Sequence, residues 1–98
     1  MTNTGQQLSM PVNGIGLYGI YPNPVTNELT ARYYLPKNGK AVFSIIDIEG
    51  KIVGKLNLSD QPGGFSNQRF STANLAPGIY MLKLTTGNET SVMKFTKF

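Results

Sequence analysis

The stretch Leu29–Leu35, which reads LTARYYL, is the strongest indication of fold in this chain. The residues at positions 29, 31, 33 and 35 are apolar or aromatic, and Thr30, Arg32 and Tyr34 stand between them. Successive side chains of a β-strand point to opposite faces of the sheet. The alternation therefore predicts a half-buried strand whose odd-numbered side chains face the core.

Similar patterns on both sides of this stretch predict further strands. The most hydrophobic of them, Lys40–Ile48 (KAVFSIIDI), carries β-branched residues on both faces and is expected to be a central strand. The others are expected at residues 15–20, 52–58, 65–71 (an edge strand), 80–85 and 90–98. Gly or Pro interrupts every window that would hold an apolar helical stripe. Short strands at this spacing predict an all-β fold, an Ig-like antiparallel β-sandwich.

The connections between these strands carry signals of their own. Pro36–Gly39 contains an Asn-Gly pair, which supplies the positive φ angles of a tight hairpin turn between the flanking strands. Other turns and loops are expected at residues 47–51, 59–64, 74–78 and 86–89. Gly78 is expected to adopt a backbone conformation that other residues avoid. Tyr80 is expected to bury its ring while its hydroxyl bonds to a nearby loop.

The domain organisation follows from length and punctuation. Residues 1–14 are expected to form a linker, because they are mostly polar, carry Pro and Gly, and show no periodicity. Residues 15–98 then form one domain. No segment approaches the about 20 apolar residues of a membrane span, and the first residues do not resemble a signal peptide. The chain is expected to be either cytoplasmic or a fragment of a larger exported protein, and the motifs below favour the fragment.

The composition argues against an enzyme, because the sequence contains no His, Cys or Trp. Thiol nucleophiles, Ser-His-Asp relays, disulfides and His/Cys metal clusters are excluded on that ground. Asp47 and Glu49 are the only close pair of carboxylates. Such a pair would suit acid–base work or calcium, but a solvated turn before Gly50, capped by Asp47, is the favoured interpretation. We expect no catalytic residue, no cofactor and no metal site.

The formal net charge is +4, and the whole excess lies in residues 50–98, where Lys and Arg stand singly rather than in runs. This spacing argues against a nucleic-acid-binding surface. Tyr and Phe number five each, which leaves open a face that stacks on sugars, although Tyr33 and Tyr80 are expected to face inward. An Ig-like adhesive or carbohydrate-binding module is therefore the alternative interpretation.

Four short motifs follow one another in a characteristic order. They are Tyr21-Pro22-Asn23-Pro24, Asp47-x-x-Gly50-Lys51, Ala76-Pro77-Gly78-Ile79-Tyr80 and the final Lys94-Phe95-Thr96-Lys97-Phe98. Each alone is weak, but in this order and spacing they resemble the C-terminal sorting domain of the Bacteroidetes type IX (Por) secretion system. The resemblance is to the type A form and covers residues 21–98. Structural roles are expected for Tyr21, Pro22, Asn23, Pro24, Asp47, Gly50, Pro77, Gly78 and Tyr80.

The resemblance implies a cleavable export signal that performs no catalysis. The cargo would enter the periplasm by an ordinary N-terminal signal, and the outer-membrane translocon would then recognise the folded domain. A dedicated cell-surface peptidase would remove the domain, within residues 1 to about 20 if it cuts accessible extended backbone. The cargo would remain outside the cell or on its surface, often attached to anionic lipopolysaccharide.

The terminal strand is the expected recognition element. Lys94 and Lys97 stand among apolar neighbours in a pattern that core packing does not require. A receptor is therefore expected to read Lys94, Phe95, Thr96, Lys97 and Phe98 through backbone pairing and the two charges. Removal of these residues is expected to leave a folded domain. An exposed first or last strand would also allow two copies to exchange strands or to pair edge to edge.

Overall fold

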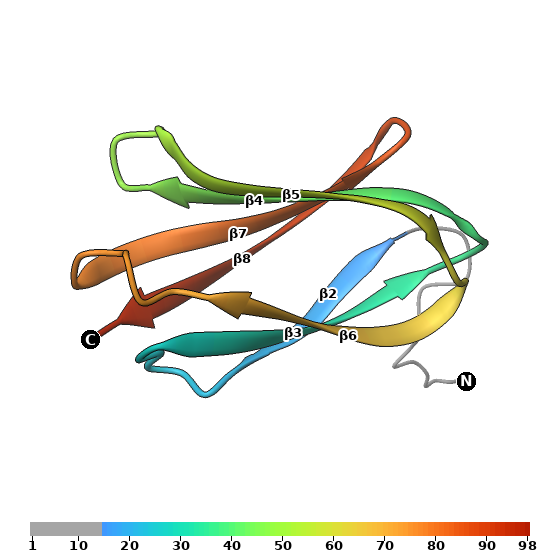
Figure 1. The fold of residues 1–98 in the computed structure, drawn as a ribbon. Helices are drawn as coiled ribbons and strands as arrows, with labels where there is room; N and C mark the ends of the chain where they lie inside the picture. Colours follow the sequence, from blue (N-terminus) through green and yellow to red (C-terminus); the bar gives the residue numbers. More distant parts are fainter. Residues whose placement is uncertain (1–14) are drawn as a thin grey trace, which may run out of the picture.

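Seven strands and no helix make up residues 15–98, the part of the chain that this computed structural model describes (Figure 1). The strands are β2 (Gly16–Tyr21), β3 (Glu28–Leu35), β4 (Gly39–Asp47), β5 (Ile52–Gln61), β6 (Gly64–Ser71), β7 (Gly78–Thr86) and β8 (Glu89–Lys97). They form two antiparallel sheets, so the predicted all-β sandwich is confirmed. The linker predicted for residues 1–14 lies outside the described residues.

The smaller sheet has the order β2-β3-β6. Its central strand β3 is paired along its whole length with β6, and β6 is an edge strand as predicted. Leu29, Ala31, Tyr33 and Leu35 are at most 1% exposed, which confirms the inward face expected from the alternation.

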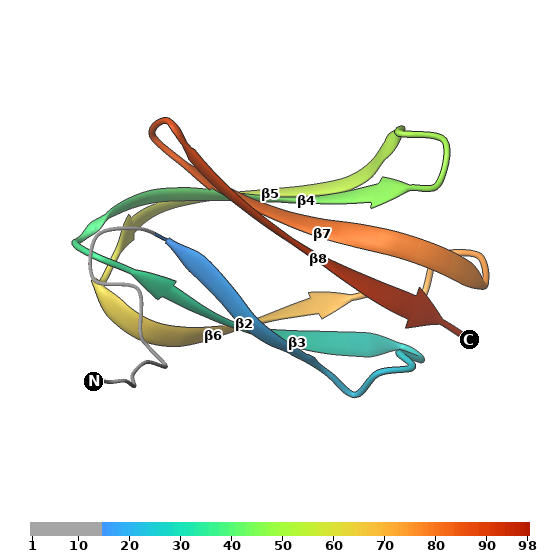
Figure 2. The ribbon, with the colours of Figure 1, turned by 180° about the vertical axis from the view of Figure 1, so that it is seen from behind.

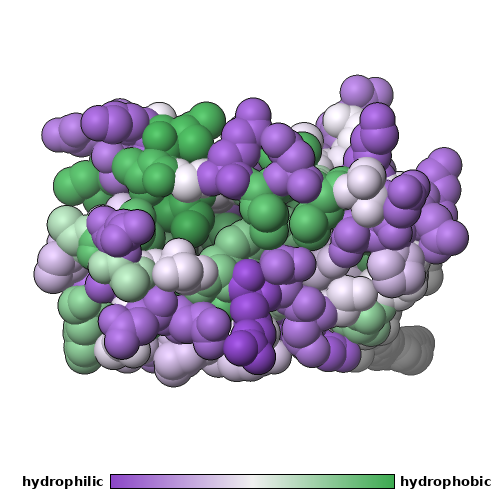
Figure 3. All heavy atoms as spheres, viewed as in Figure 1, coloured by the Kyte–Doolittle hydropathy of each residue, from purple (hydrophilic) through white to green (hydrophobic). Residues whose placement is uncertain are grey.

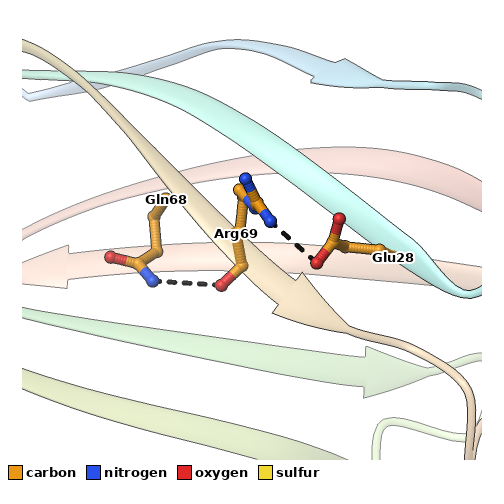
Figure 4. A network of polar contacts seen from close by, with 3 residues as sticks. All are labelled: Glu28, Gln68 and Arg69. Carbon is orange, nitrogen blue, oxygen red and sulfur yellow. Dashed lines mark hydrogen bonds and ion pairs between the residues drawn. The ribbon is translucent and has the colours of Figure 1, made fainter.

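Polar contacts join and flank the β3–β6 pair (Figure 4). Arg69 lies 3.6 Å from the carboxylate of Glu28, and the Gln68 amide donates to the backbone oxygen of Arg69. Both partners of the ion pair are more than half exposed. Exposed pairs of this kind contribute at most about 1 kcal/mol, so the sheet depends on its buried face for stability.

The larger sheet has the order β5-β4-β7-β8, with β4 in the interior as its hydrophobicity predicts. Phe43, Leu82 and Leu84 of this sheet are fully buried. The ring of Phe43 meets that of Tyr33 from the smaller sheet edge to face, with 5.1 Å between centroids. A pair in this geometry adds about 0.5–1.5 kcal/mol to the gain from burial. The core is thus built where β3 and β4 face each other across the sandwich.

The hairpin predicted at Pro36–Gly39 is wrong, because β3 and β4 belong to different sheets. Neither Asn38 nor Gly39 has a positive φ angle. The Asn38 side chain instead accepts a hydrogen bond from the backbone N–H of Gly63 at 2.8 Å, which joins two connections between the sheets. A Cβ atom on Gly63 would lie 2.9 Å from the Cα of Lys37, so only glycine allows this close approach.

The loop predicted at residues 59–64 is shorter than expected. β5 continues to Gln61 and β6 begins at Gly64, so Pro62 and Gly63 alone connect them. Positive φ angles at Asp60 (56°) and Gly64 (95°) turn the chain from one sheet to the other within this short span.

The two open sides of the sandwich differ. On one side β2 and β8 are in contact, as Figure 2 shows, and two backbone N–H groups of residues 15–17 donate to side chains of β8. On the other side β5 and β6 diverge. A pocket of about 320 Å³ opens there, lined by Phe43, Ile45, Leu56 and Phe70 among others. Figure 3 shows hydrophobic side chains along this opening.

Candidate recognition site

The Pro-Asn-Pro segment lies against the final strand, although the two are at opposite ends of the described sequence. The Asn23 side-chain oxygen accepts a hydrogen bond from the backbone N–H of Thr96 at 3.1 Å. The N–H of Val25 donates to the oxygen of Thr96 at 2.7 Å, and the N–H of Phe98 donates to the oxygen of Val25 at 2.9 Å. The segment thereby covers the edge of β8 that faces away from β7.

Val25 is the residue that fixes this arrangement, and the motif analysis missed it. It forms a parallel bridge with Lys97 and is fully buried in the same core as Phe95. Pro22 and Pro24, which precede it, follow cis peptide bonds and have no N–H to offer a further strand. In the sequence, Val25 is a single apolar residue between Pro24 and Thr26 and belongs to no periodic pattern, so the sequence did not indicate its role.

Thr72 ties the connection after Pro24 to the bend before β7. It is fully buried, its hydroxyl donates to the oxygen of Thr26 at 2.9 Å, and its N–H donates to the oxygen of Asn27 at 2.8 Å. A buried hydroxyl costs free energy unless it is hydrogen-bonded, and here the bond is made. Sequence reasoning also missed Thr72, because its partners are set only by the tertiary fold.

Tyr80 behaves as predicted. Its ring is buried and stacks on that of Phe95, with 5.6 Å between centroids, and its hydroxyl donates to the oxygen of Ala76 at 2.6 Å. This bond holds the Ala76-Pro77-Gly78 bend against β7, as in the tyrosine corner of β-sandwiches. Gly78 has φ of 158°, which is close to extended backbone, so its predicted need for an unusual conformation is weak.

The Asp47 turn belongs to the same end of the molecule, because Asp47 pairs with Tyr80 and Tyr80 pairs with Phe95 across the larger sheet. Asp47 Oδ1 accepts from the backbone N–H groups of Glu49 and Lys51, both at 2.9 Å. Gly50 has φ of 85°, a conformation that favours glycine. The structure thus confirms the predicted turn capped by Asp47.

The five residues of the final motif are not presented alike. Lys94 and Phe98 are exposed and Thr96 is half-buried, whereas Phe95 is 1% and Lys97 7% exposed. Lys97 pairs with Gly78 as Phe95 pairs with Tyr80, so both side chains lie on the inner face of the sheet. The Lys97 ammonium donates to the backbone oxygen of Phe98 at 3.2 Å. The burial of Phe95 in the core argues against the expectation that the motif can be removed without loss of the fold.

The remaining chemistry-bearing residues do not form a second site. Within residues 15–98, no group of three or more Asp or Glu side chains is arranged to hold a metal ion. The same residues contain no helix long and apolar enough to cross a membrane. Tyr18 and Tyr34 meet the ring of Phe65 at interplanar angles of 75° and 58°, and the Arg32 guanidinium lies 4.5 Å from its centroid. Rings tilted in this way do not form the flat platform on which a sugar stacks.

The four motifs thus meet at the end of the sandwich where β4, β6 and β8 finish, on the left in Figure 1. A family model described as "Secretion system C-terminal sorting domain" matches residues 19–97, which include the Pro-Asn-Pro segment, both turns and nearly all of the final motif. A search of curated proteins found no match.

Proposed function

The chain belongs to the family of secretion system C-terminal sorting domains, and from this premise we propose that its translocon reads a folded corner rather than a free tail. A domain of this family is a C-terminal sorting signal for type IX secretion, so the protein that carries it is exported toward the outer membrane or cell surface. The adhesive alternative is not favoured.

One observation supports the corner as the element that is read. Asn23 and Val25 hydrogen-bond to Thr96, and Phe98 to Val25, so the outer edge of the final motif is already paired within its own chain. A receptor that added a strand to this edge would first have to displace the Pro-Asn-Pro segment. Recognition of the assembled surface requires no such step and rejects a sorting domain that is unfolded.

The exposed groups of this corner are the contacts we propose for the translocon. Lys94, Thr96 and Phe98 present their side chains outward, whereas Phe95 and Lys97 act by holding the strand in place. A surface peptidase then cleaves the chain ahead of β2, within the first residues, and the cargo stays on the cell surface or is released. The domain itself performs no catalysis.

A reporter fusion tests this proposal. Residues 1–98 are joined to the C-terminus of a periplasmic reporter in cells with an active type IX system, and the reporter is measured in the periplasm, on the surface and in the medium. We expect surface or extracellular reporter in these cells and periplasmic reporter in matched cells without the translocon. Retention in the periplasm of both strains would reject the proposal.

A separate proposal is that two copies of the domain pair through the edges of their sheets. Among the described strands, β2, β5 and β6 each have one edge without a hydrogen-bonded neighbour, whereas the end of β8 is covered by Asn23–Val25, so strand exchange or edge pairing would use one of those three. Light scattering over a wide concentration range tests it, and a constant monomer mass would reject it.

A further inference from the structure

The middle of the outer face of the larger sheet carries lysine side chains. Its strand positions include Lys55 on β5, Lys83 on β7 and Lys94 on β8. Ser44 on β4 is the partner of both Lys55 and Lys83, and only 8% of it is exposed, so it lies between these two lysines. Among the described residues, the acidic side chains of these four strands lie near strand ends: Asp47 closes β4, Asp60 precedes the last residue of β5, and Glu89 opens β8.

An apolar hollow lies on the same face beside Lys94. It has a volume of about 380 Å³ and is lined mainly by Ile46, Ile48, Ile79 and Met81. Ile48 is 80% and Ile79 is 48% exposed, which is unusual for large aliphatic side chains. Figure 3 shows hydrophobic side chains gathered over the β4–β5 hairpin and the neighbouring part of β7.

The hollow is continuous with the corner formed by the final motif. Met81 pairs with Lys94 and Ile79 pairs with Thr96, so these two lining residues of β7 are one strand, about 5 Å, from outward-facing residues of the motif. Asp47 also lines the hollow, but its Oδ1 is held by the N–H groups of Glu49 and Lys51. The surface therefore offers an apolar cavity flanked by a free ammonium group.

We propose that this face binds an acidic segment of a partner protein, which inserts one large apolar side chain into the hollow and sets carboxylates against Lys94 and Lys83. This inference rests on the proposed function, because it specifies the chemical character of the translocon segment that would bind the corner. Charge complementarity with the lysines requires the partner segment to carry negative charge. A cavity that buries an apolar anchor, with polar groups around it, is the usual centre of a protein–protein contact.

The shape of the surface favours a protein over an anionic membrane. Domains that bind a bilayer insert protruding apolar side chains among the headgroups. Here Ile46, Ile79 and Met81 line a hollow on the sheet, so a flat bilayer would leave it empty. An extended segment with a Leu or Phe side chain would fill it.

A titration with two synthetic peptides tests the chemistry. One peptide alternates Glu with Leu, the other alternates Gln with Leu, and each is added to the purified domain while methyl NMR signals are followed. We expect the acidic peptide to bind at least about tenfold more tightly at low salt and to shift the signals of Ile46, Ile79 and Met81. Equal binding of the two peptides, or no binding, would overturn the proposal.

The export assay then separates this inference from the proposed function. Lys94→Glu and Ile79→Thr are introduced into the reporter fusion, with Lys37→Glu as a control at the other end of β4. We expect about a tenfold loss of export for the first two, no loss for the control, and unchanged melting temperatures for all three. If the unmodified fusion is not exported, the proposed function itself fails. If it is exported and both variants are exported equally well, the inference fails and Lys94 is removed from the proposed translocon contacts, whereas the sorting function stands.

A vesicle assay covers the competing partner. Purified domain is sedimented with phosphatidylglycerol–phosphatidylcholine vesicles and with phosphatidylcholine vesicles alone. Binding to the anionic vesicles that Lys94→Glu abolishes would assign the face to a membrane and overturn the protein partner. We expect no difference between the two vesicle types.

Discussion

The side-chain oxygen of Asn23 accepts a hydrogen bond from the backbone N–H of Thr96 across 73 positions of the sequence. The bond joins the motif that opens the folded domain to the one that closes it. The bond is exposed to solvent, so its contribution to the free energy of unfolding is modest. It nevertheless links two segments that are far apart in the sequence. Four predictions follow from this corner and the residues behind it.

Replacement of Asn23 by Ala is expected to lower the free energy of unfolding by about 1 kcal/mol, because the N–H of Thr96 loses its acceptor. Asn23→Asp keeps an acceptor oxygen and is the matched control. Urea denaturation followed by circular dichroism measures both. Equal stability of Asn23→Ala and the unmodified domain would show that the bond does not hold the corner together.

Phe95 and Phe98 lie three positions apart, yet their replacement by Ala is expected to change the free energy of unfolding by very different amounts. Phe95 is 1% exposed and stacks on Tyr80, so Phe95→Ala should cost about 3–5 kcal/mol. Phe98 is 68% exposed, so Phe98→Ala should stay within about 0.5 kcal/mol. A domain of this length has only about 5–15 kcal/mol of stability, so deletion of the whole motif should unfold it.

Thermal melting of the two single variants and of the deletion provides the measurement. A deletion variant that melts cooperatively near the temperature of the intact domain would contradict the assignment of Phe95 to the core. If the deletion unfolds the domain as expected, its loss of export says nothing about recognition, because unfolding suffices to explain it.

Replacing the two lysines of the final motif one at a time is expected to distinguish a residue that the translocon recognises from one that packs in the fold. Lys94 is exposed beside Met81, so Lys94→Met should reduce export while leaving the melting temperature unchanged. Lys97 is 7% exposed and faces inward, so Lys97→Met should retain both export and stability, because the new side chain fills the same space. Reporter export and thermal melting are measured side by side. Loss of export in a folded Lys97→Met variant would show that its charge is read.

Tyr80→Phe is expected to lower stability by about 0.5–1.5 kcal/mol, because the hydroxyl that donates to Ala76 is lost while the stack on Phe95 remains. Tyr21→Phe is the control, since its hydroxyl donates to Asn67 in an exposed position and should contribute less. Denaturant titration compares the two. A larger loss for Tyr21→Phe would contradict the anchoring role of the Ala76 bond.

Periodicity in the sequence predicted which segments are strands and, for β3 and β7, which face is buried. The alternation in Leu29–Leu35 and at Tyr80, Leu82 and Leu84 predicted the inward side chains correctly, because a strand places every second side chain on one face whatever its partners. The turn at Asp47 was also predictable, because Asp47 bonds to residues two and four positions away. The order of the four motifs was enough to suggest the family that the later match confirmed.

Which strands pair, and how the motifs come together, depends on the packing of the two sheets and could not be predicted from local sequence. The Asn-Gly pair at residues 38–39 predicted a hairpin, but local turn propensity does not specify whether the next strand enters the same sheet or the facing one. Alternation puts Phe95 and Lys97 on one face of their strand, but it did not show that this face is the inner one, nor did it place Val25 and Thr72 at the corner. These positions depend on contacts between residues far apart in the sequence, and such contacts are set by how the two sheets pack.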